Sequence, residues 1–164
     1  AERADLLEAL ARHRGFLLHT VKGITDEEAA HRTTVSELCL GGLVKHVAYV
    51  EVRWADFIVR GPDALAGTDP AAMENHTRSF RMLPGETLDV LLQEYAAVAD
   101  GTGELVRGLS SLDVSHPLPA APWFPPGARW SARRVLLHIV AETAQHAGHA
   151  DIIREALDGS KTMG

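Results

Sequence analysis

The side chains in this sequence that most clearly could bind an ion or take part in a reaction belong to a glutamate and a histidine four positions apart, Glu142 and His146. In an α-helix this spacing places both side chains on one face, one turn apart. On a helical wheel the pair falls inside the apolar stripe formed by Val135, Ile139 and Ile153, the face expected to be buried. Burying a carboxylate beside an imidazole is costly unless something compensates both groups. The pair therefore needs either a bound ion or a mutual hydrogen bond.

A divalent metal ion is one possible compensation. The carboxylate oxygen and the imidazole nitrogen of such a pair can point at one ion, provided that a third ligand comes from elsewhere. The alternative is a Glu–His hydrogen bond inside a helical bundle, because pairs at this spacing are common by chance. His138 and His149 flank the pair along one edge of the same face.

A third candidate ligand lies on a second predicted helix, residues 39–60. His46 falls inside or at the edge of the apolar stripe of that helix, near Leu43, Val50 and Trp54. A single histidine on an apolar face is more often a packed core residue than a ligand. Metal sites in helical bundles, however, are built from side chains of facing helices. His46, Glu142 and His146 together predict a metal site, with zinc as the first choice and nickel, iron or manganese also compatible with these ligands.

The remaining candidate side chains have simpler explanations. Cys39 stands near the start of a helix, where a thiol pKa can be lowered, but a small half-buried hydrophobic role is more usual. We expect solvent-facing or supporting roles for four other histidines, His13, His19, His31 and His76.

Helical periodicity predicts four long helices, over residues 4–22, 39–60, 88–109 and 129–158. Local signals set their ends: Thr25 and Glu28 form a capping box, Thr87 and Ser131 are N-cap candidates, and Gly159 follows the last helix. No stretch is a convincing strand. The fold class expected is an all-α four-helix bundle.

The connections between the predicted helices differ in length and composition. Residues 61–85 form a linker rich in Gly, Pro, Asp and Ala, with a short, possibly helical piece at 70–82. Residues 116–127 form a proline-rich loop that carries Trp123 and Phe124. Connections of this length allow crossovers instead of a simple up-down-up-down bundle.

Length and charge narrow the functional classes. We expect residues 1–164 to form a single domain. The net charge of −6 gives no basic surface for nucleic acid, and no apolar run approaches the ~20 residues of a membrane span. With one cysteine and a charged N-terminal stretch without signal-peptide features, a reducing cytoplasm is the expected location.

Two stretches resemble a known family. GGLVKHVAYVEVRW (41–54) and RWSARRVLLHIVAETAQHAGHADIIREALDG (129–159) resemble the DinB-like superfamily, above all its actinobacterial branch of mycothiol-dependent S-transferases. The resemblance implies an up-up-down-down bundle with a divalent metal at one end of the core, and often a homodimer. It places the metal ligands on His46, Glu142 and His146. Many members have His at the position of Glu142, whereas the mycothiol-dependent maleylpyruvate isomerase branch has Glu.

The resemblance also implies a chemistry. Three protein ligands leave open metal positions, where the cation would deprotonate an exogenous thiol and so create a nucleophile. We expect a metal-dependent thiol S-transferase that conjugates a low-molecular-weight thiol, mycothiol first, with small electrophiles in detoxification. No catalytic residue beyond the ligands is expected. His138 and His149 are expected to support the site or its pocket.

The pocket itself is expected to use aromatic side chains. The cofactor-binding candidates are His149, Trp54 and Trp130. Trp123 and Phe57 are further candidates for the pocket wall, although ordinary core packing is the favoured interpretation of Phe57.

Two alternatives remain at this stage. One is a thiol-dependent isomerase or metal hydrolase that uses the same site. Isomerases of this family carry an additional C-terminal domain, and because the sequence ends at Gly164 without one, the isomerase is the less expected of the enzymes. The other is a non-catalytic stress protein that binds a metal or ligand.

Overall fold

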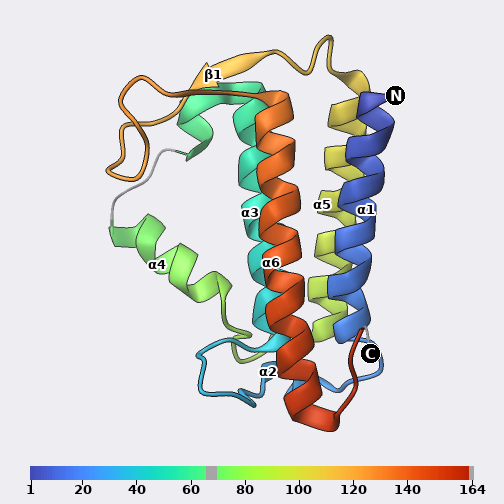
Figure 1. Cartoon of the computed structure of the whole chain (residues 1–164). Helices are drawn as coiled ribbons and strands as arrows, with labels where there is room; N and C mark the ends of the chain where they lie inside the picture. Colours follow the sequence, from blue (N-terminus) through green and yellow to red (C-terminus); the bar gives the residue numbers. More distant parts are fainter. Residues whose placement is uncertain (66–69, 163–164) are drawn as a thin grey trace.

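Four long helices form the bundle in the computed structural model, which describes residues 1–65 and 70–162 (Figure 1). They are α1 (Glu2–Thr20), α3 (Leu40–Arg60), α5 (Leu88–Gly108) and α6 (Ala132–Asp158). The predicted all-α bundle is confirmed, and each helix differs from its predicted range by only a few residues at its ends. None of the described helices combines the length and the hydropathy of a membrane span.

The helices begin and end where local signals predicted. Thr25 and Glu28 form the expected capping box at the start of α2 (Asp26–Ala30). Thr87 accepts a hydrogen bond from the Val90 backbone N–H, and Ser131 accepts one from Arg134. These side chains satisfy N–H groups that have no partner inside the helix. Gly159 follows α6 with a φ of 80°, the left-handed conformation that glycine adopts without strain.

Short elements complete the chain between the helices. A 3-10 helix η1 (Gly61–Leu65) follows α3, and α4 (Pro70–Ser79) occupies the linker where a short helix was expected. Two strands that were not predicted, β1 (Ser115–Pro117) and β2 (Arg129–Ser131), pair antiparallel, with His116 opposite Trp130. Residues 129–131 are therefore strand instead of the first turn of the last helix. Ser131 is the N-cap, so the chain before it is extended and free to pair.

The directions of the helices differ from the expected up-up-down-down order. In Figure 1, α1 runs downward, α3 and α5 run upward, and α6 runs downward. The start of α1 contacts the end of α5 and the start of α6, because Arg3 donates to the Val106 carbonyl and Arg133 pairs with Glu2. Only the connection between α3 and α5 travels the length of the bundle. The β1–β2 pair keeps the other long connection at one end.

Two apolar clusters fill the bundle, one toward each end. The lower cluster takes residues 40–48 of α3 and 147–153 of α6, and the upper cluster takes residues 54–58 of α3 and 132–139 of α6. Buried polar side chains lie near the junction of the two clusters: His46, Glu51, Thr143 and His146. The candidate metal site is therefore near the middle of these helices, whereas the family resemblance implied one end of the core.

Candidate metal centre and its pocket

The three predicted ligands come together between α3 and α6. His46, Glu142 and His146 each offer a nitrogen or oxygen atom, and these atoms lie within 4.8 Å of one another. His146 Nε2 is 3.7 Å from Glu142 Oε2. The two imidazole rings meet edge to face, with 4.8 Å between their centroids. The amphipathic stripes of two adjacent helices thus place two imidazoles and one carboxylate around one point.

A hydrogen-bond chain determines which nitrogen of His46 is free. Ser79 Oγ donates to the His76 carbonyl at 2.6 Å, which uses the one proton of the hydroxyl. The same oxygen is 2.8 Å from His46 Nδ1, so it accepts a hydrogen bond from that nitrogen. His46 therefore carries its proton on Nδ1, and Nε2 keeps its lone pair. Metal-binding histidines are commonly held in this way by a partner on the other nitrogen.

Gly42 makes the Ser79–His46 hydrogen-bond chain possible. A Cβ at this position would lie 2.0 Å from the Phe80 carbonyl oxygen, closer than any side chain tolerates. The missing side chain lets the backbone after α4 cross the first turn of α3. As a result Phe80 stacks on the His46 ring, with 3.6 Å between centroids and 19° between planes. His46 is held between Phe80 and Ser79 and is 2% exposed.

The partners on α6 are arranged differently. His146 Nδ1 is 3.4 Å from His149 Nδ1, and when His146 is the donor its Nε2 is left unprotonated. Glu142 is flanked by two imidazoles, with His138 Nε2 at 3.8 Å and His146 Nε2 at 3.7 Å. Both distances exceed hydrogen-bond length. The Glu–His hydrogen bond that was the alternative to a metal is therefore not formed.

Burial shifts the protonation of all three groups. It lowers the pKa of His46 to about 3, with repulsion from His146 and His76 as lesser causes. It also lowers the pKa of His146 to about 4, with His149 contributing. Burial raises the pKa of Glu142, although His76 acts in the opposite direction. At neutral pH both imidazoles are neutral, which is the form that binds metal.

These residues fit a divalent ion. The set offers two neutral imidazoles and a carboxylate, a combination that zinc and several transition metals accept. Glu142 has no hydrogen-bonding partner of its own among the described residues. A positive ion between the three side chains would compensate the partly buried carboxylate, which neither neighbouring imidazole does at neutral pH.

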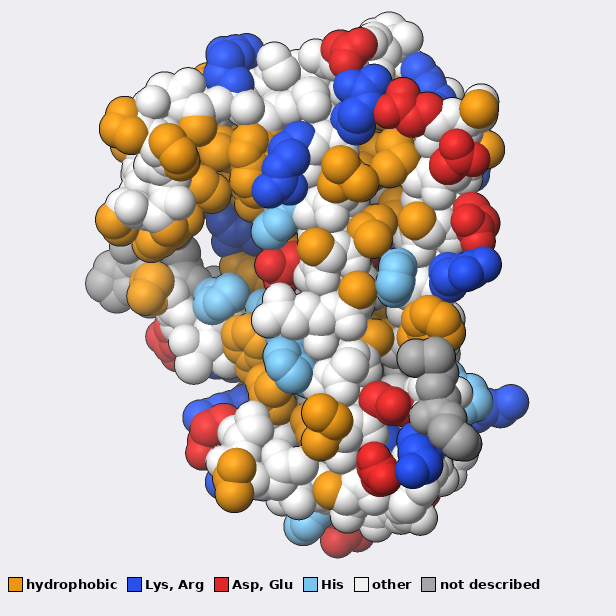
Figure 2. All heavy atoms as spheres, in the orientation of Figure 1, with side chains coloured by type: hydrophobic (Ala, Val, Ile, Leu, Met, Phe, Trp, Pro, Cys, Tyr) orange, Lys and Arg blue, Asp and Glu red, His pale blue; other side chains and the backbone are white. Residues whose placement is uncertain are grey.

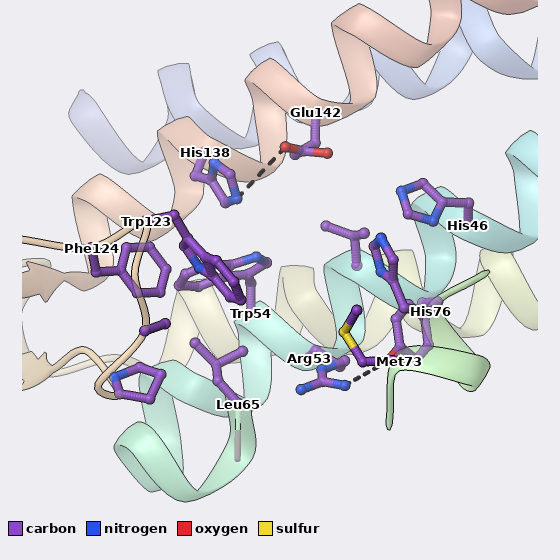
Figure 3. A pocket seen from close by; sticks show the side chains of 14 residues that line it. His46, Arg53, Trp54, Leu65, Met73, His76, Trp123, Phe124, His138 and Glu142 are labelled. Atoms are coloured by element: carbon purple, nitrogen blue, oxygen red, sulfur yellow. Dashed lines mark hydrogen bonds and ion pairs between the residues drawn. The ribbon is translucent and has the colours of Figure 1, made fainter. Parts of the chain in front are cut away.

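A cavity of about 510 Å³ opens beside the ligands. Figure 2 shows the surface hollowed between the bundle and the segments that flank it, with histidine, acidic and basic side chains at the hollow. In Figure 3, His138 and Glu142 face His46, Trp54 and Arg53 across this space, while His76 and Met73 come from α4 and Trp123 and Phe124 from the proline-rich loop. His46 and Glu142 are the two ligands in the cavity wall. A small molecule in the cavity would thus lie directly beside them.

The structure divides the other predicted pocket residues into two groups. Trp54 and His138 line the cavity, as does Trp123. Trp130 is behind Trp54, stacked on it with 4.8 Å between centroids, and His149 is behind His146. Phe57 is fully buried in the upper apolar cluster. Trp130 and His149 are therefore placed to support residues of the site without lining the cavity.

Several residues of the site have no counterpart in the sequence predictions, among them Ser79, Phe80, Tyr49 and Arg53. Ser79 and Phe80 hold His46, but they lie in a stretch where no apolar periodicity marks an inner face. Tyr49 and Arg53 line the cavity. A signal for Arg53 was available, because it follows His46 by seven residues and so lies on the same face of α3. His76 is exposed as expected and lines the cavity as well.

Comparisons with known proteins agree with this architecture. A family model described as Mycothiol-S-transferase matches residues 5–159. The crystal structure of a conserved protein from Enterococcus faecalis resembles the chain with a TM-score of 0.64. The likeness covers 94% of this chain and 96% of that one at 18% sequence identity, which shows a shared fold over the whole bundle and nothing further. No curated protein matches the chain significantly.

Proposed function

The chain belongs to the mycothiol S-transferase family, within the DinB-like superfamily, and we propose that it is a metal-dependent enzyme that transfers a low-molecular-weight thiol to small electrophiles. One observation carries the proposal. His46 and Glu142 lie in the wall of the same cavity as a set of apolar and aromatic side chains, so an ion and an electrophile would be neighbours.

His46, Glu142 and His146 would hold the ion, with zinc as the first choice. When bound, a divalent ion supplies the positive charge that lowers the pKa of a thiol beside it. Ser79 holds His46 at Nδ1 and His149 lies beside Nδ1 of His146, so both histidines would present Nε2 to the ion. These features suit an open catalytic site better than a closed structural one.

The apolar part of the cavity wall would bind the electrophile. Trp54, Phe124 and Met73 present apolar surface that would exclude water from a thiolate and hold an apolar electrophile. His76 lines the cavity and is exposed to solvent, so it makes one edge of the cavity polar. Mycothiol is the thiol that the family name suggests, and a detoxifying role would follow from its use.

The proposal is tested first by metal content and then by turnover. Protein purified without a metal-affinity tag is analysed by mass spectrometry for bound metal, beside the Glu142→Ala, His146→Ala double variant. The wild type and the variant are then assayed for conjugation of mycothiol with 1-chloro-2,4-dinitrobenzene, before and after chelator treatment and zinc return.

We expect about one ion per chain in the wild type, none in the variant, and conjugation that disappears with the chelator and returns with zinc. Absence of metal after reconstitution would overturn the proposal. Metal binding without conjugation of any electrophile in a broad panel would also overturn it, in favour of a non-catalytic binding protein.

A further inference from the structure

We infer that Arg53 is an anion-binding group for the electrophile, and that the preferred substrates are small aromatic or apolar electrophiles carrying a carboxylate. The inference rests on the proposed function. Arg53 is the sole lysine or arginine among the residues that line the described cavity. Two of the candidate metal ligands, His46 and Glu142, line the same cavity, and His46 lies seven residues before Arg53 on α3.

Arg53 has no acidic partner among the residues that the structure describes. Its Nη1 donates to Tyr49 Oη at 2.5 Å, and its guanidinium lies over the Tyr49 ring, 5.3 Å from the centroid. Other arginines near it on the bundle are neutralised: Arg60 pairs with Asp56, and Arg14 pairs with Glu51. Glu142, the acidic residue of the cavity wall, faces His138 and His146 instead. The charge of Arg53 is thus left for a ligand.

The rest of the cavity defines the shape of that ligand. A guanidinium with free N–H groups matches the two oxygens of a carboxylate. His46 and Arg53 are seven residues apart on α3, so their Cα atoms are separated by about 10 Å along the helix axis. That span leaves room for an aromatic ring that carries the carboxylate on one side and the reacting carbon on the opposite side. Val50 lies between the two on the same helix, and Trp54, which directly follows Arg53, also lines the cavity and offers an aromatic surface for such a ring.

The anion is assigned to the electrophile because mycothiol itself carries no carboxylate. A suitable probe is 4-chloro-3,5-dinitrobenzoate, with 4-chloro-3,5-dinitrobenzamide as its neutral counterpart. In the reaction the thiol sulfur forms a bond to the carbon that bears chlorine. The C–Cl bond breaks, chloride leaves with the bonding electrons, and the thiol proton passes to the buffer.

The kinetic test compares kcat/KM for the two probes in zinc-loaded wild type, Arg53→Gln and Arg53→Lys. We expect the ratio of acid to amide to fall about 10- to 100-fold in Arg53→Gln, the loss of a charge-assisted hydrogen bond, and to fall less in Arg53→Lys. Arg134→Gln is the matched control, because Arg134 is an exposed arginine stacked over Trp130 outside the cavity wall. It should keep the wild-type ratio. An unchanged ratio in Arg53→Gln would overturn the inference, and a merely structural role for Arg53 would weaken both probes equally.

A binding test separates this inference from the proposed function. Isothermal titration of metal-free protein, in chelator and without thiol, with 3,5-dinitrobenzoate and 3,5-dinitrobenzamide removes both turnover and metal coordination. Tighter binding of the acid in wild type and Arg134→Gln, lost in Arg53→Gln, would support the anion site even if no transferase activity were found. Equal affinity for acid and amide in the wild type would overturn it.

Discussion

Two buried polar clusters lie near mid-length in this bundle, and they are built on opposite principles. In the first cluster, Arg14 of α1 and Glu51 of α3 form a two-pronged ion pair. The Glu51 side chain is 0% exposed and that of Arg14 is 11% exposed. In the second, Glu142 is 29% exposed and makes no hydrogen bond to either neighbouring histidine. The first cluster satisfies its own charges, whereas the second leaves a carboxylate and two imidazole nitrogens available.

The difference separates a structural role from a functional one. The Arg14–Glu51 pair joins α1, which otherwise packs mainly on α6, to α3, which packs mainly on α5 and α6. Neither residue lines a described pocket. The His46–Glu142–His146 cluster borders a cavity and keeps its ligand atoms free. Substitutions in the first cluster should therefore change stability without changing metal binding. Substitutions in the second should mainly change metal binding, with smaller effects on stability.

The largest effect on stability is expected from Glu51→Ala. This change leaves the Arg14 guanidinium buried without its partner, which costs about 3–5 kcal/mol of the free energy of unfolding. Urea denaturation of metal-free protein measures the loss, and the double variant Arg14→Met, Glu51→Leu should recover most of it. Metal content of folded Glu51→Ala should equal that of the wild type. A loss below about 1 kcal/mol would contradict the assignment of this pair as the structural cluster.

The next largest effect should be the loss of stability on acidification, and the histidines of the second cluster should cause it. The pKa values of His46 and His146 in the folded state, about 3 and about 4, lie below the unfolded value near 6.5. The unfolded chain therefore binds more protons, and metal-free protein should lose stability as the pH falls below about 6.5. For His46 alone the loss is roughly 2 kcal/mol by pH 5.

Urea titrations in chelator at pH 7, 6 and 5 measure this slope. The His46→Gln variant should have a shallower dependence on pH, and the unchanged Arg14–Glu51 pair should contribute nothing to the difference. Equal slopes for the two proteins would mean that His46 is not held neutral by burial.

Ser79→Ala tests the part of the second cluster that orients a ligand. Removing the hydroxyl leaves His46 Nδ1 without its acceptor, which should cost about 1 kcal/mol of stability and weaken metal affinity roughly 10- to 100-fold. Thr77→Ala is a matched control, because its hydroxyl bonds only the Met73 carbonyl on the exposed side of the same helix. Competition with a chromogenic chelator gives both affinities. Similar losses in both variants would show that α4 itself, and not the Ser79–His46 hydrogen bond, supports the site.

The smallest effect on stability is expected from Glu142→Gln, although it should abolish tight metal binding. Burial already disfavours the charged form of Glu142, so the neutral amide should change the stability of metal-free protein by less than about 0.5 kcal/mol. Glu155→Gln removes an acid from the exposed face of the same helix and should keep its metal. Strong destabilisation by Glu142→Gln, with metal retained, would reverse the roles assigned to the two clusters.

Much of the fold was predictable because its signals are local. Apolar stripes of helical period mark each inner face, and side chains such as Thr25, Thr87 and Ser131 satisfy the first N–H groups wherever the helix later packs. The wheel positions of His46, Glu142 and His146 likewise follow from the helical repeat alone. The resemblance to DinB-like proteins joined the three residues into one site, and the family match supports that resemblance.

Other features could not be obtained this way. The order of helix directions depends on which connection travels along the bundle, and the β1–β2 pair requires two segments separated by the proline-rich loop to meet. Glu51 reads as one more acid on α3 until Arg14 of another helix is placed against it. Periodicity gives the angle at which a side chain leaves its helix but not the neighbour that it will meet.

The sequence by itself therefore determined the helices, their ends and the three inward-facing donor side chains, because these depend on residues within one or two turns of one another. Only the tertiary structure decided that Ser79 and Phe80 hold His46, that Glu142 has no hydrogen-bond partner among the described residues, and that Arg53 shares a cavity with His46 and Glu142. These are contacts between segments far apart in the chain, and they form only when the packing of α3, α4 and α6 brings those segments together.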